Sequence, residues 1–524
     1  MKKIFLLAIL IFGFSCSSPK FINDYSSLKS FNKSLVASKV DLNNWHNLDP
    51  EIDSIPGTSV ERAHDELLNG LKGKKVIVAV IDTGLDTGHK SLSNNIWINK
   101  DEKINGKDDD NNGYIDDING WNYLGSAYDE TRDMTRILRD NKVNNRKYDL
   151  VEEEIKKEIK RSNEQLNILN YYIQILENSK ELLSDHLNDD NFTVEDVNNI
   201  ETEDEKLIRA KNIYIDFDSY GYTREYLNEG VEQYNDFINY HFNTDYNGRK
   251  TNDDIYDLYD TNYGDPNISN IKDSESHSTH VSGIISGDRQ NEKGNKGINN
   301  LVEIMALRAI PNGDEYDKDV ALAIRYCVNN GAKVLNTSFG KGFSPHPEWV
   351  WDAIRYASDN DVLIVNAAGN DGMDLDQNEV YPNDVRPGEV KEIGDTFITI
   401  GASTPEYNDN LVAGFSNYGK ENVDVFSPGV KIWATTPLDT YEYLQGTSMA
   451  APAVAGVAAV IRSYFPKLKA AQVKQILMDS GLSGPGNVIL GGDPNRVDNF
   501  SNISKSGHLV NLYNALIMAD QLSR

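Results

Sequence analysis

Cysteine is almost absent from this chain, whose 524 residues include two, Cys16 and Cys327. Cys16 stands where an export signal would be cleaved or modified, which leaves a mature chain with one thiol and no internal disulfide. Cys327 lies in a helix-like segment, and we expect it to pack as a small apolar residue.

Positive charge is also scarce, because 52 lysines and arginines face 81 aspartates and glutamates, for a formal net charge of −29. A protein that binds phosphate backbones needs the opposite sign, so nucleic acid is excluded as an expected partner. The acidity bears on solubility more than on chemistry. The hydrophobic share of 39% is ample for a large core.

A long apolar run occurs at the N-terminus, in "MKKIFLLAILIFGFSC". It is too short to span a bilayer in the ordinary way, and its two lysines and small residues have the layout of a bacterial export signal over residues 1–16. The residues before Cys16 resemble a lipobox, although Gly13 replaces the usual leucine-like residue. We therefore expect an exported protein anchored in the cell envelope by a lipid on Cys16; an ordinary cleaved signal is the alternative.

Residues 17–71 are expected to form a polar tether and a lead-in to the folded body. From Val76 onward, apolar runs are continuous rather than alternating, which indicates strands buried on both faces. Helix-like stretches lie between several of them, so the pattern predicts an α/β fold with a mostly parallel sheet between two layers of helices. The runs are "VIVAVIDTG", "VEIMALRAI", "AKVLNTSFG", "DVLIVNAAGN", "TFITIGAST" and "VDVFSPGV".

Residues 126–245 do not follow this alternation of apolar runs and helix-like stretches, because they are highly charged and contain few glycines or prolines. Apolar residues recur at helical spacing in two stripes, which predicts an inserted helical segment packed on itself or on the main domain. The stripes are Leu166, Leu169, Ile173, Leu176 and Leu183, and Tyr226, Leu227, Val231, Tyr234 and Ile238.

Four polar residues stand at informative places. Asp82 and Asn370 close apolar strands, and Ser448 precedes a helix of small residues. Singly, each has an ordinary explanation as a turn residue or helix cap. Together with His277 they suit nucleophilic catalysis, because a serine needs a base, and the base needs an orienting carboxylate. The amide of Asn370 and the backbone N–H of Ser448 would then stabilise the oxyanion.

These residues resemble the subtilisin-like serine proteases (subtilases), in the chain order aspartate, histidine, asparagine, serine. The resemblance rests on "VIVAVIDTG", "HSTHVSGIISG", "VNAAGN" and, most specifically, "GTSMAAP". It covers about residues 72–124 and 246–520. It implies a catalytic domain over residues 72–524, interrupted by residues 126–245, that hydrolyses peptide bonds in proteins or peptides without a catalytic cofactor.

The resemblance assigns Asp82, His277 and Ser448 to a catalytic triad and Asn370 to the oxyanion site. It also places Ser338, Phe339 and Gly340 along the substrate cleft. Three departures accompany it. Ser278 stands where the family usually has glycine, and the 195 positions from Asp82 to His277 far exceed the spacing in compact members. Residues 17–60 are too short and polar for the usual folded propeptide.

Two other functions are consistent with parts of the sequence. A catalytically impaired, protease-like binding protein would present the helical segment to a partner, and Ser278 is its one hint. A metallohydrolase would use His277 and His280, but HSTH lacks the third ligand and the glutamate of patterns such as H-E-x-x-H.

The stretch "KDDDNNGYIDDING" suggests a structural calcium site. Its residues fall at the early positions of an EF-hand-type loop, although Asn119 occupies the place of the final glutamate. A solvated acidic turn is the alternative. The expected ligands are Asp108, Asp110, Asn112, the carbonyl of Tyr114, and Asp116.

Overall fold

The computed structural model describes residues 43–140, 148–219, 221–291 and 294–524. The expected export signal, the lipid-bearing Cys16 and most of the expected tether lie outside these residues.

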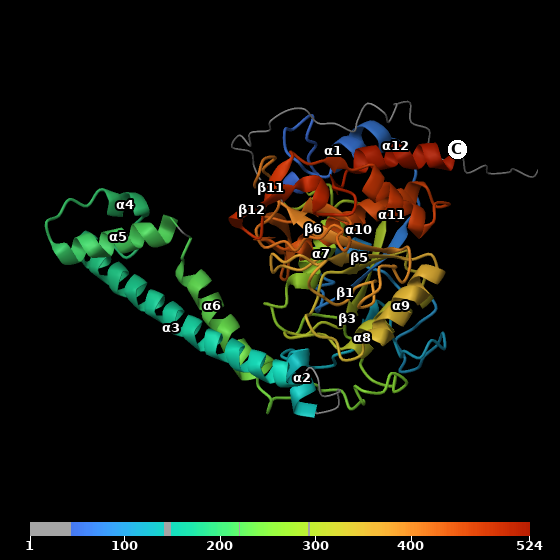
Figure 1. The fold of residues 1–524 in the computed structure, drawn as a ribbon, viewed down its shortest axis with the longest axis horizontal. Helices are drawn as coiled ribbons and strands as arrows, with labels where there is room; N and C mark the ends of the chain where they lie inside the picture. The colour runs from blue at the N-terminus through green and yellow to red at the C-terminus, as the bar shows by residue number, and fades with distance from the viewer. Residues whose placement is uncertain (1–42, 141–147, 220, 292–293) are drawn as a thin grey trace, which may run out of the picture.

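A nine-stranded sheet forms the centre of the body (Figure 1). Its strands are ordered β10-β13-β7-β6-β5-β4-β1-β3-β2, and all neighbouring pairs are parallel except β10 with β13. The strands are β1 (Val76–Asp82), β2 (Gly120–Asn122), β3 (Val302–Arg308), β4 (Val334–Thr337), β5 (Leu363–Ala367), β6 (Phe397–Ser403), β7 (Val425–Pro428), β10 (Leu482–Ser483) and β13 (His508–Leu509).

Helices cover both faces of this sheet. Alternate residues of β1 enter different apolar clusters: Val78 and Val80 face one side, and Ala79 and Ile81 face the other. Burial of both faces explains why the strands read as continuous apolar runs, and the predicted α/β architecture is confirmed. One layer contains α7 (His277–Ser286), α10 (Thr447–Tyr464), α11 (Ala470–Asp479) and α12 (Leu512–Ser523), and the other contains α8 (Asp317–Asn329) and α9 (Pro347–Asp359).

The described part of the expected lead-in packs against the body. Trp45, in a short 3-10 turn (Trp45–Asn47), is fully buried, and its Nε1 donates to the carbonyl of Val430 at 3.0 Å. The segment continues through α1 (Val60–Ala63) and a π-helical turn (His64–Leu68) beside α12 (Figure 1).

Two antiparallel hairpins complete the body. They are β8 (Ile432–Thr436) with β9 (Thr440–Leu444), and β11 (Asn487–Leu490) with β12 (Asp493–Asn499). The hairpin β8–β9 lies against α7, so it helps to position the residues that begin this helix.

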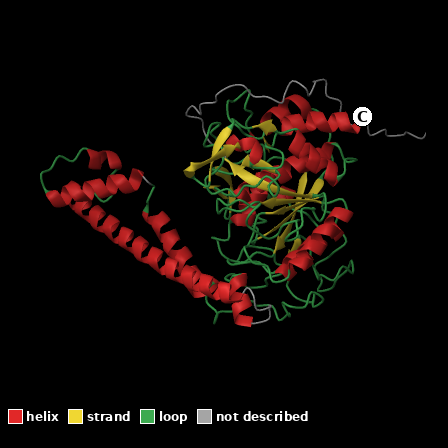
Figure 2. Ribbon diagram, in the orientation of Figure 1, coloured by secondary structure: helices red, strands yellow, loops and turns green. Residues whose placement is uncertain are grey.

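The described residues between 133 and 241 form a long helical arm that projects from the body (Figure 2). The 40-residue α3 runs outward, and the shorter helices α5 and α6 pack back along it. None of the helices in the described ranges is long and apolar enough to cross a membrane. The arm consists of α2 (Asp133–Asp140), α3 (Tyr148–Leu187), α4 (Val194–Asn198), α5 (Glu205–Ser219), α6 (Arg224–Asp236) and a π-helical turn (Phe237–His241).

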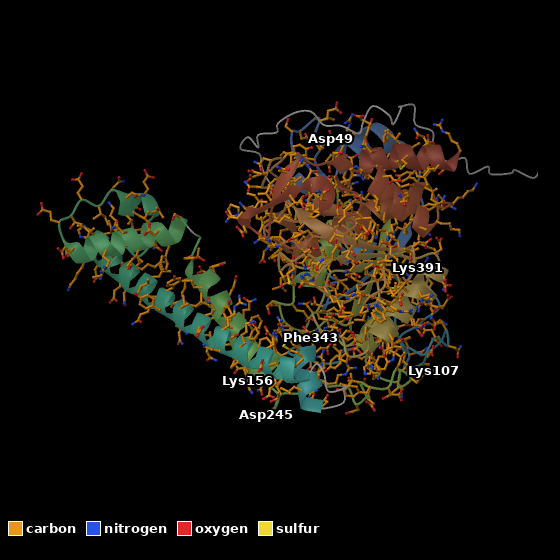
Figure 3. All side chains as sticks on the ribbon, in the orientation of Figure 1. Asp49, Lys107, Lys156, Asp245, Phe343 and Lys391 are labelled. Atoms are coloured by element: carbon orange, nitrogen blue, oxygen red, sulfur yellow. The ribbon has the colours of Figure 1, made fainter. Side chains whose placement is uncertain are left out.

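Separate apolar clusters stabilise the two ends of the arm. At the tip, Leu183 is fully buried in a cluster with residues of α4 and α5. At the base, Val151 and Ile155 of α3 pack with Met134 and Phe242, and Phe343 of the body joins this cluster. The base of the arm is therefore continuous with the body near Phe343 (Figure 3).

Candidate active site

Asp82 and His277 meet at the carboxyl edge of the sheet. Asp82 is the last residue of β1, and His277 is the first residue of α7. The His277 Nδ1 atom lies 2.8 Å from Asp82 Oδ1, which also accepts the backbone N–H of Thr83 at 2.7 Å. Because a carboxylate accepts, Nδ1 carries the proton and the lone pair of Nε2 is left to act as a base.

The two residues differ in exposure, and this shapes the electrostatics. The Asp82 side chain is 2% exposed, whereas that of His277 is 34% exposed and open to a substrate. Burial lowers the pKa of His277 and is the largest single effect. The charge of Asp82 and its hydrogen bond act in the opposite direction, and together they raise the pKa of His277 above 6.5.

Ser448 lies in the first turn of α10, the helix that packs beside α7. Its hydroxyl donates to the carbonyl of Ser338 at 3.1 Å, and the Ser338 hydroxyl donates back to the carbonyl of Ser448 at 2.9 Å. No hydrogen bond joins Ser448 to His277 within the described ranges. Transfer of the proton to His277 therefore requires rotation of the Ser448 side chain away from Ser338, a rearrangement common in substrate-free sites.

The carboxamide of Asn370 is oriented by the start of α10. Its Oδ1 accepts the backbone N–H of Thr447 at 2.8 Å and the Thr447 hydroxyl at 3.0 Å. The same hydroxyl accepts the N–H of Gly369 at 3.0 Å, which fixes the loop that carries Asn370. With Oδ1 engaged in this way, the Nδ2 group of Asn370 is free to donate elsewhere.

Two donor nitrogens lie close to one point beside Gly446. A Cβ atom at Gly446 would lie 3.5 Å from both Asn370 Nδ2 and the backbone nitrogen of Ser448. First-turn N–H groups have no acceptor within their own helix, so Ser448 N–H is available there. The two groups can therefore stabilise an oxygen that becomes negative, and glycine at 446 leaves room for it.

Ser278 adds no new hydrogen bond to this site. Its side chain is buried, and its hydroxyl has no hydrogen-bond partner among the residues that the structure describes. Its backbone N–H donates to the Thr83 hydroxyl at 3.1 Å, beside the pairing of Asp82 with His277. The serine at this position is therefore compatible with the orientation of the imidazole.

His280 is a structural residue. It is fully buried, and its Nε2 lies 3.1 Å from the carbonyl of Ile432 and 3.2 Å from that of Glu442. Two carbonyls can only accept, so Nε2 donates, and burial lowers the pKa of His280 to about 3. Neither His277 nor His280 belongs to a group of three or more side chains that could hold a metal ion, among the residues that the structure describes.

The segment after β4 connects the site to the arm. Ser338 is buried, Phe339 is half-buried and Gly340 is exposed. The next residue, Lys341, is buried and forms ion pairs with Asp317 at 2.8 Å and with Asp133 of α2. The predicted cleft residues are therefore followed directly in the chain by Lys341, whose side chain binds the base of the arm.

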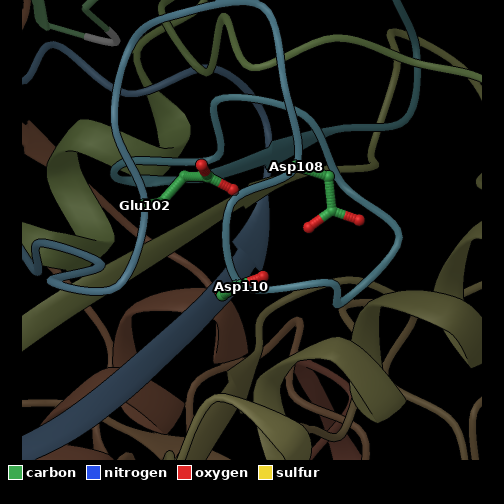
Figure 4. A group of neighbouring side chains, drawn as sticks. All are labelled: Glu102, Asp108 and Asp110. Carbon is green, nitrogen blue, oxygen red and sulfur yellow. The ribbon is translucent and has the colours of Figure 1, made fainter.

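The predicted calcium residues do not all come together. Asp108 and Asp110 converge with Glu102, and their carboxylate oxygens lie within 4.8 Å of one another (Figure 4). Asp116 instead accepts the backbone N–H of Asn105 at 2.8 Å, which caps a turn. The amide of Asn112 presents its nitrogen to Asp110 at 3.2 Å and its oxygen to the N–H of Tyr114 at 2.8 Å.

Glu102 and Thr447 were missed by reasoning from the sequence. Glu102 lies outside the EF-hand-type spacing, and only its place among other acidic residues hints at a role. Thr447 precedes Ser448 in "GTSMAAP", and this place in the motif is the one signal that could have indicated its role. Its hydroxyl connects the start of α10 to the loop that carries Gly369 and Asn370.

Comparison with known proteins identifies the family. The model of the Subtilase family (Peptidase S8) matches residues 73–502, well over half of the chain. The chain belongs to the subtilase family.

This subtilase is similar to several characterised relatives. It is 35% identical over 209 residues to the "Thermophilic serine proteinase" of Bacillus sp. (strain AK1), covering 40% of this chain and 46% of that protein. It is 34% identical over 207 residues to Subtilisin DY of Bacillus licheniformis, covering 39% and 70%. It is 31% identical over 210 residues to the "Cell wall-associated protease" of Bacillus subtilis (strain 168), covering 40% and 21%.

A solved structure of a cold adapted subtilisin-like serine proteinase aligns with a TM-score of 0.36 and 26% identity, over 48% of this subtilase and 79% of that chain. In sequence, the subtilase spans less than half the length of the first relative named above.

Proposed function

We propose that this subtilase is a serine endopeptidase that cleaves peptide bonds through Asp82, His277 and Ser448. The observation that carries the proposal is the 2.8 Å contact between His277 Nδ1 and Asp82 Oδ1, two residues 195 positions apart. Membership of the family and the convergence of Asn370 Nδ2 with Ser448 N–H support it.

In this mechanism, Ser448 Oγ attacks the carbonyl carbon of the substrate while His277 Nε2 takes its proton. Asp82 stabilises the resulting imidazolium, and the amides of Asn370 and Ser448 stabilise the oxyanion. His277 then protonates the leaving amine, and an acyl-enzyme forms on Ser448. Water attacks this ester with His277 again as base, which releases the acid product and restores Ser448.

The proposed substrates are proteins or peptides bound in extended form. The segment Ser338, Phe339 and Gly340 follows β4, and its first residue accepts a hydrogen bond from the Ser448 hydroxyl. An extended peptide along this segment would therefore lie beside the proposed nucleophile. The net charge of −29 disfavours nucleic acid as a partner.

Labelling with a fluorophosphonate probe tests this function directly. The probe reacts with an activated serine, so we expect covalent modification at Ser448, located by mass spectrometry of tryptic peptides. Folded protein that takes up no label and cleaves no peptide would contradict the proposal. That result would instead favour a protease-like binding protein that presents the helical arm.

We also propose a structural Ca²⁺ site at Glu102, Asp108 and Asp110. Their carboxylate oxygens are the hard donors that Ca²⁺ prefers. None of the three forms an ion pair with a lysine or arginine within the described ranges, so a cation would offset their mutual repulsion. The site would stabilise the loop before β2 and has no role in the chemical step.

Removal of Ca²⁺ is expected to lower the free energy of unfolding by about 2–3 kcal/mol, relative to free Ca²⁺ at roughly 100 times its Kd. Thermal unfolding with and without a chelator measures this difference. The double variant Asp108→Asn/Asp110→Asn should lose the dependence on Ca²⁺, whereas Asp109→Asn, at an exposed neighbour, should keep it. An equal response to chelator in both variants would refute the site.

We further propose that the protein is exported and anchored to the cell envelope by a lipid on Cys16. The export-signal pattern of residues 1–16 supports this location, and one relative is named a cell wall-associated protease. Cys16→Ser is expected to move the protein from the membrane fraction to the soluble fraction, and mass spectrometry of the wild-type N-terminus should show a lipid. An unmodified N-terminus downstream of residue 16 would indicate an ordinary cleaved signal.

A further inference from the structure

A hollow of about 460 Å³ lies between the arm and the body. We call it the arm pocket. Its volume falls in the range of about 300–1,000 Å³ that is typical of ligand pockets. Its lining comes from Glu229, Glu232 and Asp236 on α6, Arg132 and His241 at the arm base, and Pro311–Gly313 of the body, among others.

The body wall of the arm pocket continues directly from the proposed active site. The backbone N–H groups of Ala309 and Ile310 donate to the carbonyl of Asp82 at 2.9 and 3.1 Å. Pro311–Gly313 come next in the chain, and Ser274, three residues before His277, also lines the pocket. Short chain segments therefore link the pocket lining to two of the three triad positions.

The distance from the residues after β4 to the arm pocket equals the length of a few residues of extended peptide. The sheet order β4-β1-β3 places the residues after β3 two strands from those after β4. Neighbouring strands are about 4.8 Å apart, and an extended peptide advances about 3.3 Å per residue. An extended substrate that crosses the strand ends from Ser338 toward Pro311 would therefore bring a side chain about three residues from the cleaved bond to the pocket.

The arm wall of the pocket is acidic. Glu229, Glu232 and Asp236 recur at helical spacing, so they share one face of α6. None of them forms an ion pair with a lysine or arginine inside the described part of the chain. Asp236 Oδ2 accepts the amide of Asn312 at 2.8 Å, which joins α6 to the body.

The positive groups nearby offset part of this charge, because Arg132 lines the pocket and forms no ion pair within the described ranges. Arg132 is held over the rings of Phe237 and Phe242, 5.2 and 5.5 Å from their centroids. On the body side, Lys272 is paired with Asp129 at 3.8 Å.

His241 is a neutral, deeply buried group in the lining. It is 5% exposed, and burial followed by the charge of Arg132 lowers its pKa. Its Nε2 faces the carbonyl of Asn312 at 3.2 Å and so donates to it. Its buried Nδ1 has no hydrogen-bond partner among the described residues and is left as an acceptor. The lining thus combines this acceptor and the carboxylates of α6 with one unpartnered donor, the buried Nε of Arg132.

We infer that the arm pocket is a specificity site that takes a lysine or arginine side chain of the peptide substrate, about three residues from the cleaved bond. A cation with several N–H donors matches the carboxylates of α6. The inference rests on the proposed function for its cleavage consequences, but binding of the peptide can be measured without cleavage.

The test compares peptides that carry lysine or glutamine at one position, scanned from four residues before to four residues after the cleaved bond. Binding is measured on the Ser448→Ala protein, and kcat/KM is measured on the active protein. Lysine is expected to improve both by about tenfold at one position, about three residues from the cleaved bond. Because the contact is ionic, the preference should shrink at high salt.

The charge-removing variant Glu229→Gln/Glu232→Gln is expected to reduce the preference for lysine over glutamine to about twofold, through weaker binding and slower cleavage of the lysine peptides. The matched control, Glu195→Gln/Glu203→Gln, removes two exposed acids at the arm tip and should keep the full preference. A full preference in the α6 variant, or equal binding of both peptides by the parent protein, would overturn the inference. A protein that binds lysine peptides selectively but takes up no probe would refute the proposed function alone.

Discussion

Replacement of Ser448 by alanine is expected to lower kcat by about five to six orders of magnitude, the loss that removal of a triad nucleophile produces in serine proteases. The substitution removes the atom that forms the acyl-enzyme, so only substrate binding and stabilisation by Asn370 and the backbone N–H of residue 448 remain. Steady-state hydrolysis of a chromogenic peptide at saturating substrate measures the effect.

The control for Ser448→Ala is Ser463→Ala, near the other end of the same helix. The Ser463 hydroxyl accepts the amide of Asn299 at 3.3 Å, far along α10 from the proposed chemistry. This variant should label with the fluorophosphonate probe and keep kcat within a few-fold of wild type. A loss of less than tenfold in Ser448→Ala would show that another group is the nucleophile.

Replacement of Asp82 by asparagine is expected to lower kcat by about four orders of magnitude and to change its pH dependence. The amide cannot stabilise an imidazolium, and it favours the wrong tautomer of His277. In the wild type, the Asp82 carboxylate helps to raise the pKa of His277. Only the neutral imidazole accepts a proton, so kcat/KM should rise with pH as His277 loses its proton, with a midpoint above 6.5.

Without the charge of Asp82, the pKa of His277 falls, so the rising limb of the residual activity should move to lower pH. Profiles of kcat/KM from pH 4 to 9 measure this shift. The control, Asp86→Asn, alters a nearby carboxylate that accepts the N–H of Gly88 and should keep the wild-type profile. An unmoved limb in Asp82→Asn would mean that a group other than His277 controls the acid side.

The fold and the centre of the site could be predicted because they depend on local and repeating signals. Continuous apolar runs such as residues 76–81 indicate strands buried on both faces, and parallel strands bring their carboxyl ends to one edge. Asp82 and Asn370 follow two such runs, so their proximity to this edge follows from topology. The pairing of Asp82 with His277 was expected from the family's motifs.

Contacts that depend on distant, irregular segments were beyond prediction. Lys341 binds Asp133 across 208 positions, and neither residue belongs to a periodic pattern or a motif. Glu102 joins Asp108 and Asp110 because of the path of a loop, which no spacing rule describes. The acidic face of α6 could be read as an ordinary solvated helix surface until the structure placed it opposite residues 311–313.

The ion pair between Lys341 and Asp133 limits where a deletion that shortens the arm can begin. Asp133 also binds Arg136 at 2.6 Å, so excision from residue 133 onward would take away the carboxylate that Lys341 shares with the arm. Lys341 would then keep Asp317, at 2.8 Å, as its remaining ion-pair partner within the described ranges. A deletion that begins after Ile155 and stops before Phe237 would instead retain the apolar base around Phe343, and the shortened protein would report on the distal helices alone.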